Sequence, residues 1–266
     1  FVDLEQNLKE QLRRKPTKTE VADIIYYYSF YAIVHGEAEA GLKYLNFAIS
    51  EMELSFDEPR LSQLLSRRAI LEARIEHPKF IKLAEKDALR ARSLAEKYHE
   101  PHLLALSALA LSICSRKKEN FDAAFKYIRE AEKNYAELKR IPQYIESIIE
   151  YLKVILLGLE KDAFDKKELL KVVSNIEKNV QSYIIERINV FEPEFCYLMG
   201  MITAQHVSNV SKKEILTWFS DAISLAQQFK QDGNYEYFRE TCNQLKILDQ
   251  VEKRIKKAKA KASVTN

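Results

Sequence analysis

Histidine and cysteine are the residue types in this sequence best suited to chemistry, because they bind metals and serve as bases and nucleophiles. His99 and His102 flank Glu100 and Pro101 with the spacing of a metal-binding pair. Pro101, however, is typical of a helix start, and no further Cys or His nearby completes a set of four ligands. We therefore expect no metal site, and we interpret the segment as a solvated junction between two helices.

Catalytic residue combinations are equally sparse. Cys196 and His206 have the types of a nucleophile and its base, but ten residues along one predicted helix separate their side chains by nearly three turns. Glu192 and Glu194 flank Pro193 near the start of that helix, where carboxylates interact favourably with the helix dipole. The glycines never cluster, which excludes the loops that hold phosphates and dinucleotides. We expect no catalytic residues, no cofactor and no enzymatic activity.

Arginine side chains favour binding rather than catalysis. Arg67, Arg68 and Arg74 lie on one predicted helix, and planar guanidinium groups bind carboxylates and phosphates through paired hydrogen bonds. We consider these three residues candidates for an anion-binding edge of a partner groove. A solvated helix face is the alternative interpretation.

Tyrosines supply a second set of candidates. Tyr27, Tyr144 and Tyr151 lie on predicted helices of the same kind as the arginines, and tyrosine is a frequent anchor in protein interfaces. Burial in the core is the alternative for each of them. With His102, these residues and the three arginines form the predicted partner-binding set.

The composition indicates a folded chain rich in helix. Of its 266 residues, 47% are hydrophobic and 30% are charged, as in globular proteins with a substantial core. Only five glycines and six prolines occur, below the usual shares of about 7% and 5%, which predicts long helices with short connections. The three cysteines are far apart and odd in number, so we expect buried thiols and a cytoplasmic location. No apolar run reaches the roughly 18 residues of a membrane span.

Two series of residues indicate an internal repeat. Prolines recur near the starts of helical patterns at spacings of 43, 42, 41 and 51 residues, namely Pro16, Pro59, Pro101, Pro142 and Pro193. Small or apolar residues recur between them at spacings of 43, 40, 45 and 46 residues, namely Ala48, Ala91, Ala131, Ile176 and Ala222. Both series give a period of roughly 43 residues, which is typical of repeat architectures.

Each period is long enough for two helices. The predicted first members are 18–35, 59–76, 101–117, 142–159 and 187–208, and the second members are 38–53, 80–98, 121–138, 166–182 and 212–229. Thr17, Asp165 and Ser211 each precede a glutamate by three residues, which is the spacing of a helix-capping box. Gly36 and Gly233 lie where helices are expected to end. The aromatic segment 24–36 is then a helix rather than a β-strand.

These helix pairs form one predicted domain over 1–266. It comprises a leading helix within 1–17, five helical repeats over 18–229, a capping helix over 230–258 and a basic tail over 259–266. The capping helix is predicted because apolar residues recur there at three- and four-residue steps and form a stripe along one side of the helix. The tail has little to bury, so we expect it to be solvated.

The repeats resemble the tetratricopeptide family. The clearest copy spans LALSICSRKKENFDAAFKYIREAEKNYAEL, in which apolar and small residues fall at the family spacing, namely Leu111, Phe121, Ala124, Ile128 and Ala131. Leu157-Gly158 reproduces the Leu-Gly pair of the family's first helix. The resemblance covers residues 18–229. The period exceeds the family's usual 34 residues, which longer helices or loops account for.

The resemblance implies an all-α fold, a right-handed α-α superhelix of about five helix pairs with a C-terminal capping helix. It also implies a non-catalytic scaffold or regulatory module that binds a protein or peptide in a concave groove lined by the first helices. The start of the chain at Phe1 adds the rest of a larger multidomain protein as an expected partner.

A nucleic-acid-binding helical repeat is the alternative function. Residues 252–261 carry six basic residues and one acidic residue, while the chain as a whole has a net charge of only +3. The rest of the chain therefore lacks the basic stripe that follows a nucleic-acid backbone. We expect a protein or peptide partner in preference to nucleic acid.

Overall fold

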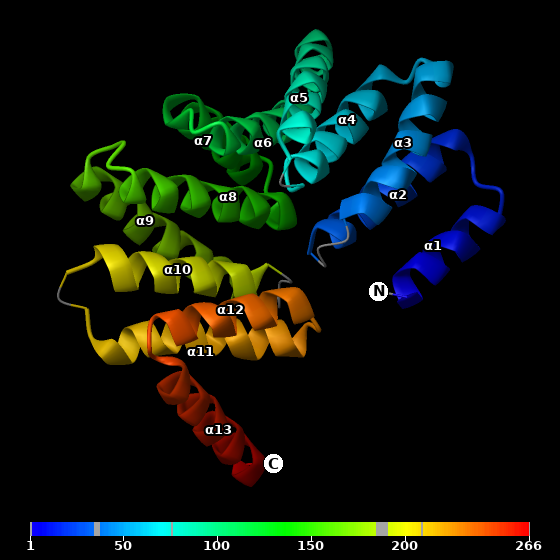
Figure 1. Cartoon of the computed structure of the whole chain (residues 1–266). Helices are drawn as coiled ribbons and strands as arrows, with labels where there is room; N and C mark the ends of the chain where they lie inside the picture. Colours follow the sequence, from blue (N-terminus) through cyan, green and yellow to red (C-terminus); the bar gives the residue numbers. More distant parts are fainter. Residues whose placement is uncertain (1, 35–37, 76, 185–190, 209, 266) are drawn as a thin grey trace. The chain divides into compact units, whose positions relative to one another are not determined.

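The structure is a computed structural model that describes residues 2–34, 38–75, 77–184, 191–208 and 210–265. Helices account for nearly all of these ranges, and no β-strand occurs within them. The all-α class predicted from composition and periodicity is confirmed (Figure 1). None of the described helices is both long enough and apolar enough to cross a membrane.

Thirteen helices run through the described ranges. They are α1 Val2–Arg13, α2 Lys18–Val34, α3 Ala38–Ser55, α4 Glu58–Glu72, α5 Pro78–Tyr98, α6 Pro101–Lys117, α7 Phe121–Glu137, α8 Ile141–Glu160, α9 Lys166–Ile184, α10 Glu192–His206, α11 Lys212–Gln228, α12 Asp232–Gln244 and α13 Leu248–Thr265. The leading helix and the ten paired helices predicted from the sequence correspond to α1–α11. The aromatic segment that begins at residue 24 is helical as far as Val34. Helix α10 begins at Glu192, later than the predicted 187, and 185–190 lie outside the described residues.

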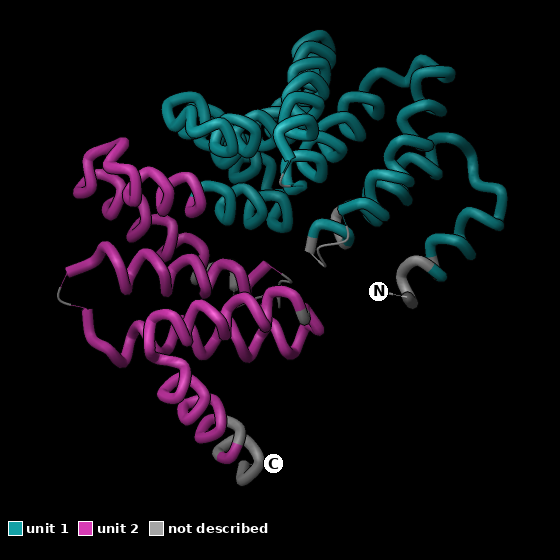
Figure 2. Tube along the Cα trace, viewed as in Figure 1, with its two compact units in different colours: residues 1–151 teal, residues 152–266 magenta. Residues whose placement is uncertain are grey.

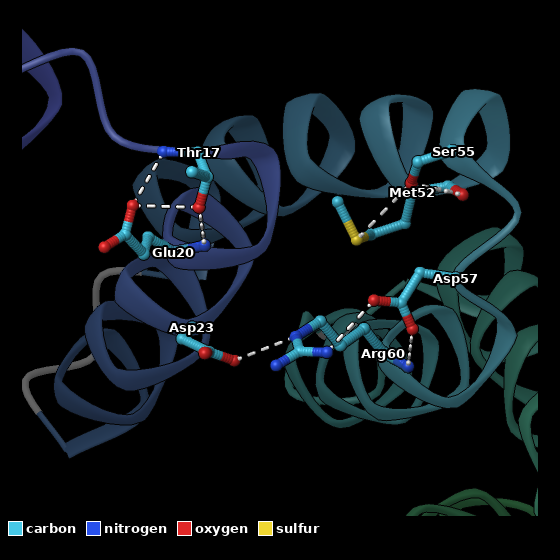
Figure 3. Close-up of polar contacts among 7 residues, drawn as sticks. All are labelled: Thr17, Glu20, Asp23, Met52, Ser55, Asp57 and Arg60. Atoms are coloured by element: carbon cyan, nitrogen blue, oxygen red, sulfur yellow. Dashed lines mark hydrogen bonds and ion pairs between the residues drawn. The ribbon is translucent and has the colours of Figure 1, made fainter.

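The predicted N-terminal caps are present. The Thr17 amide and hydroxyl donate to Glu20 Oε2 at 2.7 and 2.8 Å, and the Glu20 amide donates back to Thr17 Oγ1 (Figure 3). The Glu168 amide donates to Asp165 Oδ1 at 2.8 Å, and the Glu214 amide donates to Ser211 Oγ at 3.2 Å. Each cap satisfies a backbone donor that the first helical turn leaves without a partner.

Helix C-termini are closed by left-handed residues that are not glycine. Among the described residues, eight that are not glycine have φ between 51° and 56°, and each lies one or two residues beyond the end of a helix: Lys15, Phe56, His99, Glu119, Lys139, Asp162, Lys230 and Lys246. The prediction that Gly233 ends a helix is wrong, because Lys230 closes α11 and Gly233 lies in the first turn of α12. The other predicted end, Gly36, lies outside the described residues.

The C-terminal segment forms two helices, whereas the sequence predicted one capping helix over 230–258. Lys246 adopts a left-handed conformation after α12, and the Ile247 amide donates to the Cys242 carbonyl at 2.9 Å, which closes that helix. Helix α13 then begins at Leu248 and continues to Thr265, so the backbone of the predicted tail 259–266 is helical as far as Thr265.

The chain divides into two compact units, Phe1–Tyr151 and Leu152–Asn266, with the boundary inside α8 (Figure 2). In unit 1, α2 packs with α3, α4 with α5, and α6 with α7, while α4 also contacts α2, α3 and α6. Helix α7 illustrates how the second helix of such a pair packs against the first. Its buried residues recur at three- and four-residue steps and form one side of the helix, namely Ala124, Ile128, Ala131 and Tyr135.

Unit 2 has its own core. Helix α10 packs against α11, and α11 also contacts α12 and α13. Gly200 on α10 permits a close approach, because a Cβ at this position would lie 3.2 Å from the ring of Phe219 on α11. Tyr197 stacks on Phe238 of α12 with ring centres 4.5 Å apart. Aromatic packing therefore attaches α12 to the last helix pair.

Candidate functional site

A buried ion pair connects α4 and α8 within unit 1. Arg67 Nη1 donates hydrogen bonds to both carboxylate oxygens of Glu146, at 2.7 and 2.8 Å. The side chain of Arg67 is completely inaccessible and that of Glu146 is 4% exposed. Burial disfavours the charge on Arg67, but the negative charge of Glu146, together with Tyr26 and Tyr135, more than offsets this effect and keeps the pKa of Arg67 above its usual value.

Aromatic rings surround this ion pair. Arg67 Nη2 donates to the Tyr26 hydroxyl at 3.2 Å, and the guanidinium carbon lies 5.0 Å from the centre of the Tyr26 ring. Tyr135 of α7 is fully buried, and the His102 ring of α6 lies 6.1 Å from it. Burial, with the positive charges of Arg140 and Arg67, lowers the pKa of His102 to about 4, so this imidazole is neutral at pH 7. The cluster connects α2, α4, α6, α7 and α8.

Arg67, a predicted partner contact, therefore has no exposed surface for a partner. Its counter-charge Glu146 was not among the predicted functional residues. The sequence did contain a signal, because each residue places a charge within an apolar helical stretch, and a charge buried by such a helix requires an opposite charge. What the sequence did not reveal was which two charges meet across 79 residues.

The other two arginines of the predicted set bind different groups. Arg68 Nε donates to Asp87 at 2.6 Å and its Nη1 donates to Asn46 at 2.9 Å, which connects α4 with α5 and α3. Arg74 lies just beyond α4 and donates to the backbone carbonyl of Ile33 at 3.4 Å. The three arginines thus do not converge on one anion-binding edge.

Two of the predicted tyrosines belong to the core of unit 1. Tyr144 and Tyr151 are both buried on α8. Arg129 Nε donates to the Tyr151 hydroxyl at 3.1 Å, and the Phe125 ring packs edge-on against Tyr151 at 5.4 Å. His102 is half-buried beside Tyr135. None of these three predicted residues presents a large side-chain surface to solvent.

Tyr27 is the predicted residue that the fold exposes. Its side chain is 64% exposed, whereas its neighbours Tyr26 and Tyr28 are buried. The Tyr27 ring rests edge-on against Tyr26, with ring centres 5.5 Å apart. It borders an open depression of about 670 Å³, here called the Tyr27 depression, whose other lining residues are Gln11, Arg14, Lys15, Pro16, Glu20, Asp23 and Ile24.

The two carboxylates of the Tyr27 depression are already engaged. Glu20 accepts hydrogen bonds from the backbone and side chain of Thr17, which lower the pKa of Glu20. Asp23 accepts from Arg60 Nε at 3.4 Å, an interaction that connects α2 with α4 (Figure 3). Both carboxylates are therefore held in place by neighbouring residues.

The basic side chains of the Tyr27 depression are available to bind a ligand. Within the described part of the chain, the side chains of Arg14 and Lys15 form no hydrogen bond or ion pair. Lys15 is held at this position by its left-handed backbone at the end of α1. The Tyr27 depression therefore offers a ligand an aromatic ring beside two cations.

The residues considered for nucleophilic or metal chemistry lie elsewhere. Cys196 is buried on α10, and burial with the nearby charge of Asp221 raises the pKa of its thiol well above the usual value. His206 is the last residue of α10. His99 has a left-handed backbone conformation and closes α5, so it lies in the short connection that precedes Pro101, the first residue of α6.

No protein-family model matches the sequence, and no curated protein matches it.

Proposed function

We propose that this chain is a non-catalytic interaction module that binds a short segment of a partner protein at the Tyr27 depression. The exposure of Tyr27 carries this proposal. Large aromatic side chains are costly to leave in water and are typical anchors of protein interfaces. Arg14 and Lys15 beside Tyr27 favour a segment that combines an apolar side chain with a carboxylate.

We further propose that the helix pairs are tetratricopeptide-like repeats, as the sequence resemblance implies. Within unit 1, consecutive pairs α2–α3, α4–α5 and α6–α7 pack side by side, and their first helices contact one another in the order α2, α4, α6. Gly158, of the Leu-Gly pair, and Gly200 each lie against an aromatic ring: a Cβ added there would be 3.1 Å from Phe164 and 3.2 Å from Phe219, respectively. Stacking of this kind is the basis of helical solenoids. The superhelix of five pairs stays a prediction.

A peptide selection tests the binding site. A phage-displayed random peptide library is selected on the immobilised chain, and an enriched peptide is labelled with fluorescein for anisotropy titrations. Tyr27→Ala should weaken its binding about thirtyfold, since truncating an interface anchor typically costs about 2 kcal/mol. The melting temperature should change little, because the Tyr27 side chain is largely exposed.

Tyr237 provides a matched control. It is also an exposed tyrosine, 57% accessible, whose ring lies against buried aromatic residues. Tyr237→Ala should leave peptide affinity unchanged. Equal affinities for the Tyr27→Ala variant and the unmodified chain, with both proteins folded, would place the binding surface elsewhere.

A further inference from the structure

Three lysines form an exposed row at the beginning of α5. Lys79, Lys82 and Lys86 recur at three- and four-residue steps, so they share one face of the helix. All three are exposed, and the alanines through which α5 packs lie on the opposite side of the helix. We call these three residues the lysine face.

The same row of cations is neutralised in the second half of α5 but not in the first. Arg90 forms an ion pair with Glu53 at 2.7 Å, and Lys97 forms one with Glu58. Across the ranges that the structure describes, no carboxylate pairs with any residue of the lysine face. The uncompensated charge is therefore confined to the first turns of α5.

Helix stability does not account for the lysine face. Cations near a helix N-terminus oppose the helix dipole, and like charges three or four residues apart repel each other. The first turn of α5 contains no acidic residue, whereas α9 and α11, which also begin with lysines, carry Glu168 and Glu214 there. An external anion would relieve the repulsion on α5.

An apolar residue lies within the lysine face. Leu83 is 40% exposed, and together with Pro78 and the three lysines it lines an open depression of about 480 Å³. Mixed cationic and apolar character suits a protein segment better than a bare phosphate, because an apolar contact adds to the ionic one.

We propose that the lysine face is a second docking surface, for an acidic segment of a partner protein with an apolar side chain that packs on Leu83. Along the helix axis, Lys79 and Lys86 are about 10 Å apart at about 1.5 Å per residue. An extended segment of about three or four residues spans this length. A polynucleotide would need a longer row of unpaired basic residues. The next two cations along α5, Arg90 and Lys97, are neutralised by Glu53 and Glu58.

Fluorescence anisotropy tests the proposal. The probe is a fluorescein-labelled peptide with glutamates on both sides of a central leucine. The variant K79Q/K82Q/K86Q should bind it about tenfold more weakly, as expected for the loss of three exposed ion pairs. Binding to the unmodified chain should weaken as salt increases, and replacing the central leucine of the probe by asparagine should lower its affinity.

The matched control is K166Q/K167Q/K171Q, which removes three exposed lysines from the beginning of α9. This variant should bind the acidic peptide like the unmodified chain. An equal loss in both variants would overturn the proposal, because it would indicate attraction to overall charge. The proposal would also be overturned if the unmodified chain did not bind the acidic peptide but did bind an oligouridylate or phosphatidylserine vesicles, and K79Q/K82Q/K86Q lost that binding. The lysine face would then bind a nucleic acid or an anionic lipid surface.

Discussion

Removing one partner of the buried pair of Arg67 and Glu146 should strongly destabilise unit 1. Two unit charges about 4 Å apart interact by about 4 kcal/mol at the effective dielectric constant of about 20 that describes protein sites. Removing one partner leaves the other charge buried without its counter-charge, which typically costs about 3–5 kcal/mol. We therefore expect Arg67→Met and Glu146→Met each to destabilise the chain by about 4 kcal/mol.

A double-mutant cycle isolates the interaction of the two charges. Unfolding in urea, followed by far-UV circular dichroism, gives the free energy of unfolding of each variant by linear extrapolation. The double variant R67M/E146M should be far more stable than additivity predicts, because it buries no unpaired charge. If a single Met variant does not fold, Glu146→Gln keeps an acceptor for Arg67 and should lose less stability.

The ion pair of Arg90 and Glu53 is the control, since it joins the same residue types at the same 2.7 Å but is 48% and 44% exposed. Its cycle should give a coupling energy of only about 0.2–1 kcal/mol. A coupling energy for Arg67 and Glu146 no larger than this value would refute the importance of burial.

Three further predictions concern pH and helix packing. Burial and the negative charge of Asp87, against the opposing Arg68, raise the pKa of Glu72 to about 7. The unfolded value is about 4.3, so the stabilising contribution of protonated Glu72 is complete below about pH 4 and is lost as the pH rises towards 7. Urea titrations at several pH values should show the free energy of unfolding of Glu72→Gln rising by up to about 3 kcal/mol relative to that of the unmodified chain over this range. If the two free energies changed with pH in parallel, the raised pKa of Glu72 would be contradicted. Gly200→Ala should destabilise by about 1 kcal/mol, because its Cβ would lie 3.2 Å from the buried Phe219 ring. A Cβ at Gly233 would have no atom within 4 Å, so thermal unfolding should show Gly233→Ala to be more stable than the unmodified chain by about 0.5 kcal/mol. If Gly200→Ala were stabilising as well, the Phe219 ring would have to move to accommodate the added Cβ.

Helix positions were readable from the sequence because their signals are local. Asn120, for example, caps α7 by accepting a hydrogen bond from the Ala123 amide, and residues 121–138 were predicted for a helix observed at Phe121–Glu137. The break after α12 was not readable. A lysine in a left-handed conformation, Lys246, has no sequence signature comparable to glycine.

The partner-binding residues were harder to predict, because residue type does not determine which side of a helix is covered. Tyr26, Tyr27 and Tyr28 are chemically identical, and consecutive residues differ in direction by about 100° around the helix. Helix α2 contacts both α3 and α4, which is why Tyr26 and Tyr28, on two sides of the helix, are both buried while Tyr27 between them is exposed. Tyr26 also accepts the hydrogen bond from Arg67.

The same packing separates the predicted set into structural and binding residues. Arg67 was considered for an anion-binding edge because guanidinium groups bind carboxylates, and it does bind one, but the carboxylate belongs to Glu146 of the same unit. Tyr27 contacts that cluster through Tyr26, with the two rings packed edge to face. Its removal should therefore leave the ion pair and the fold intact, so a loss of peptide binding in Tyr27→Ala reports on the surface alone, whereas a loss in Arg67→Met would report on folding.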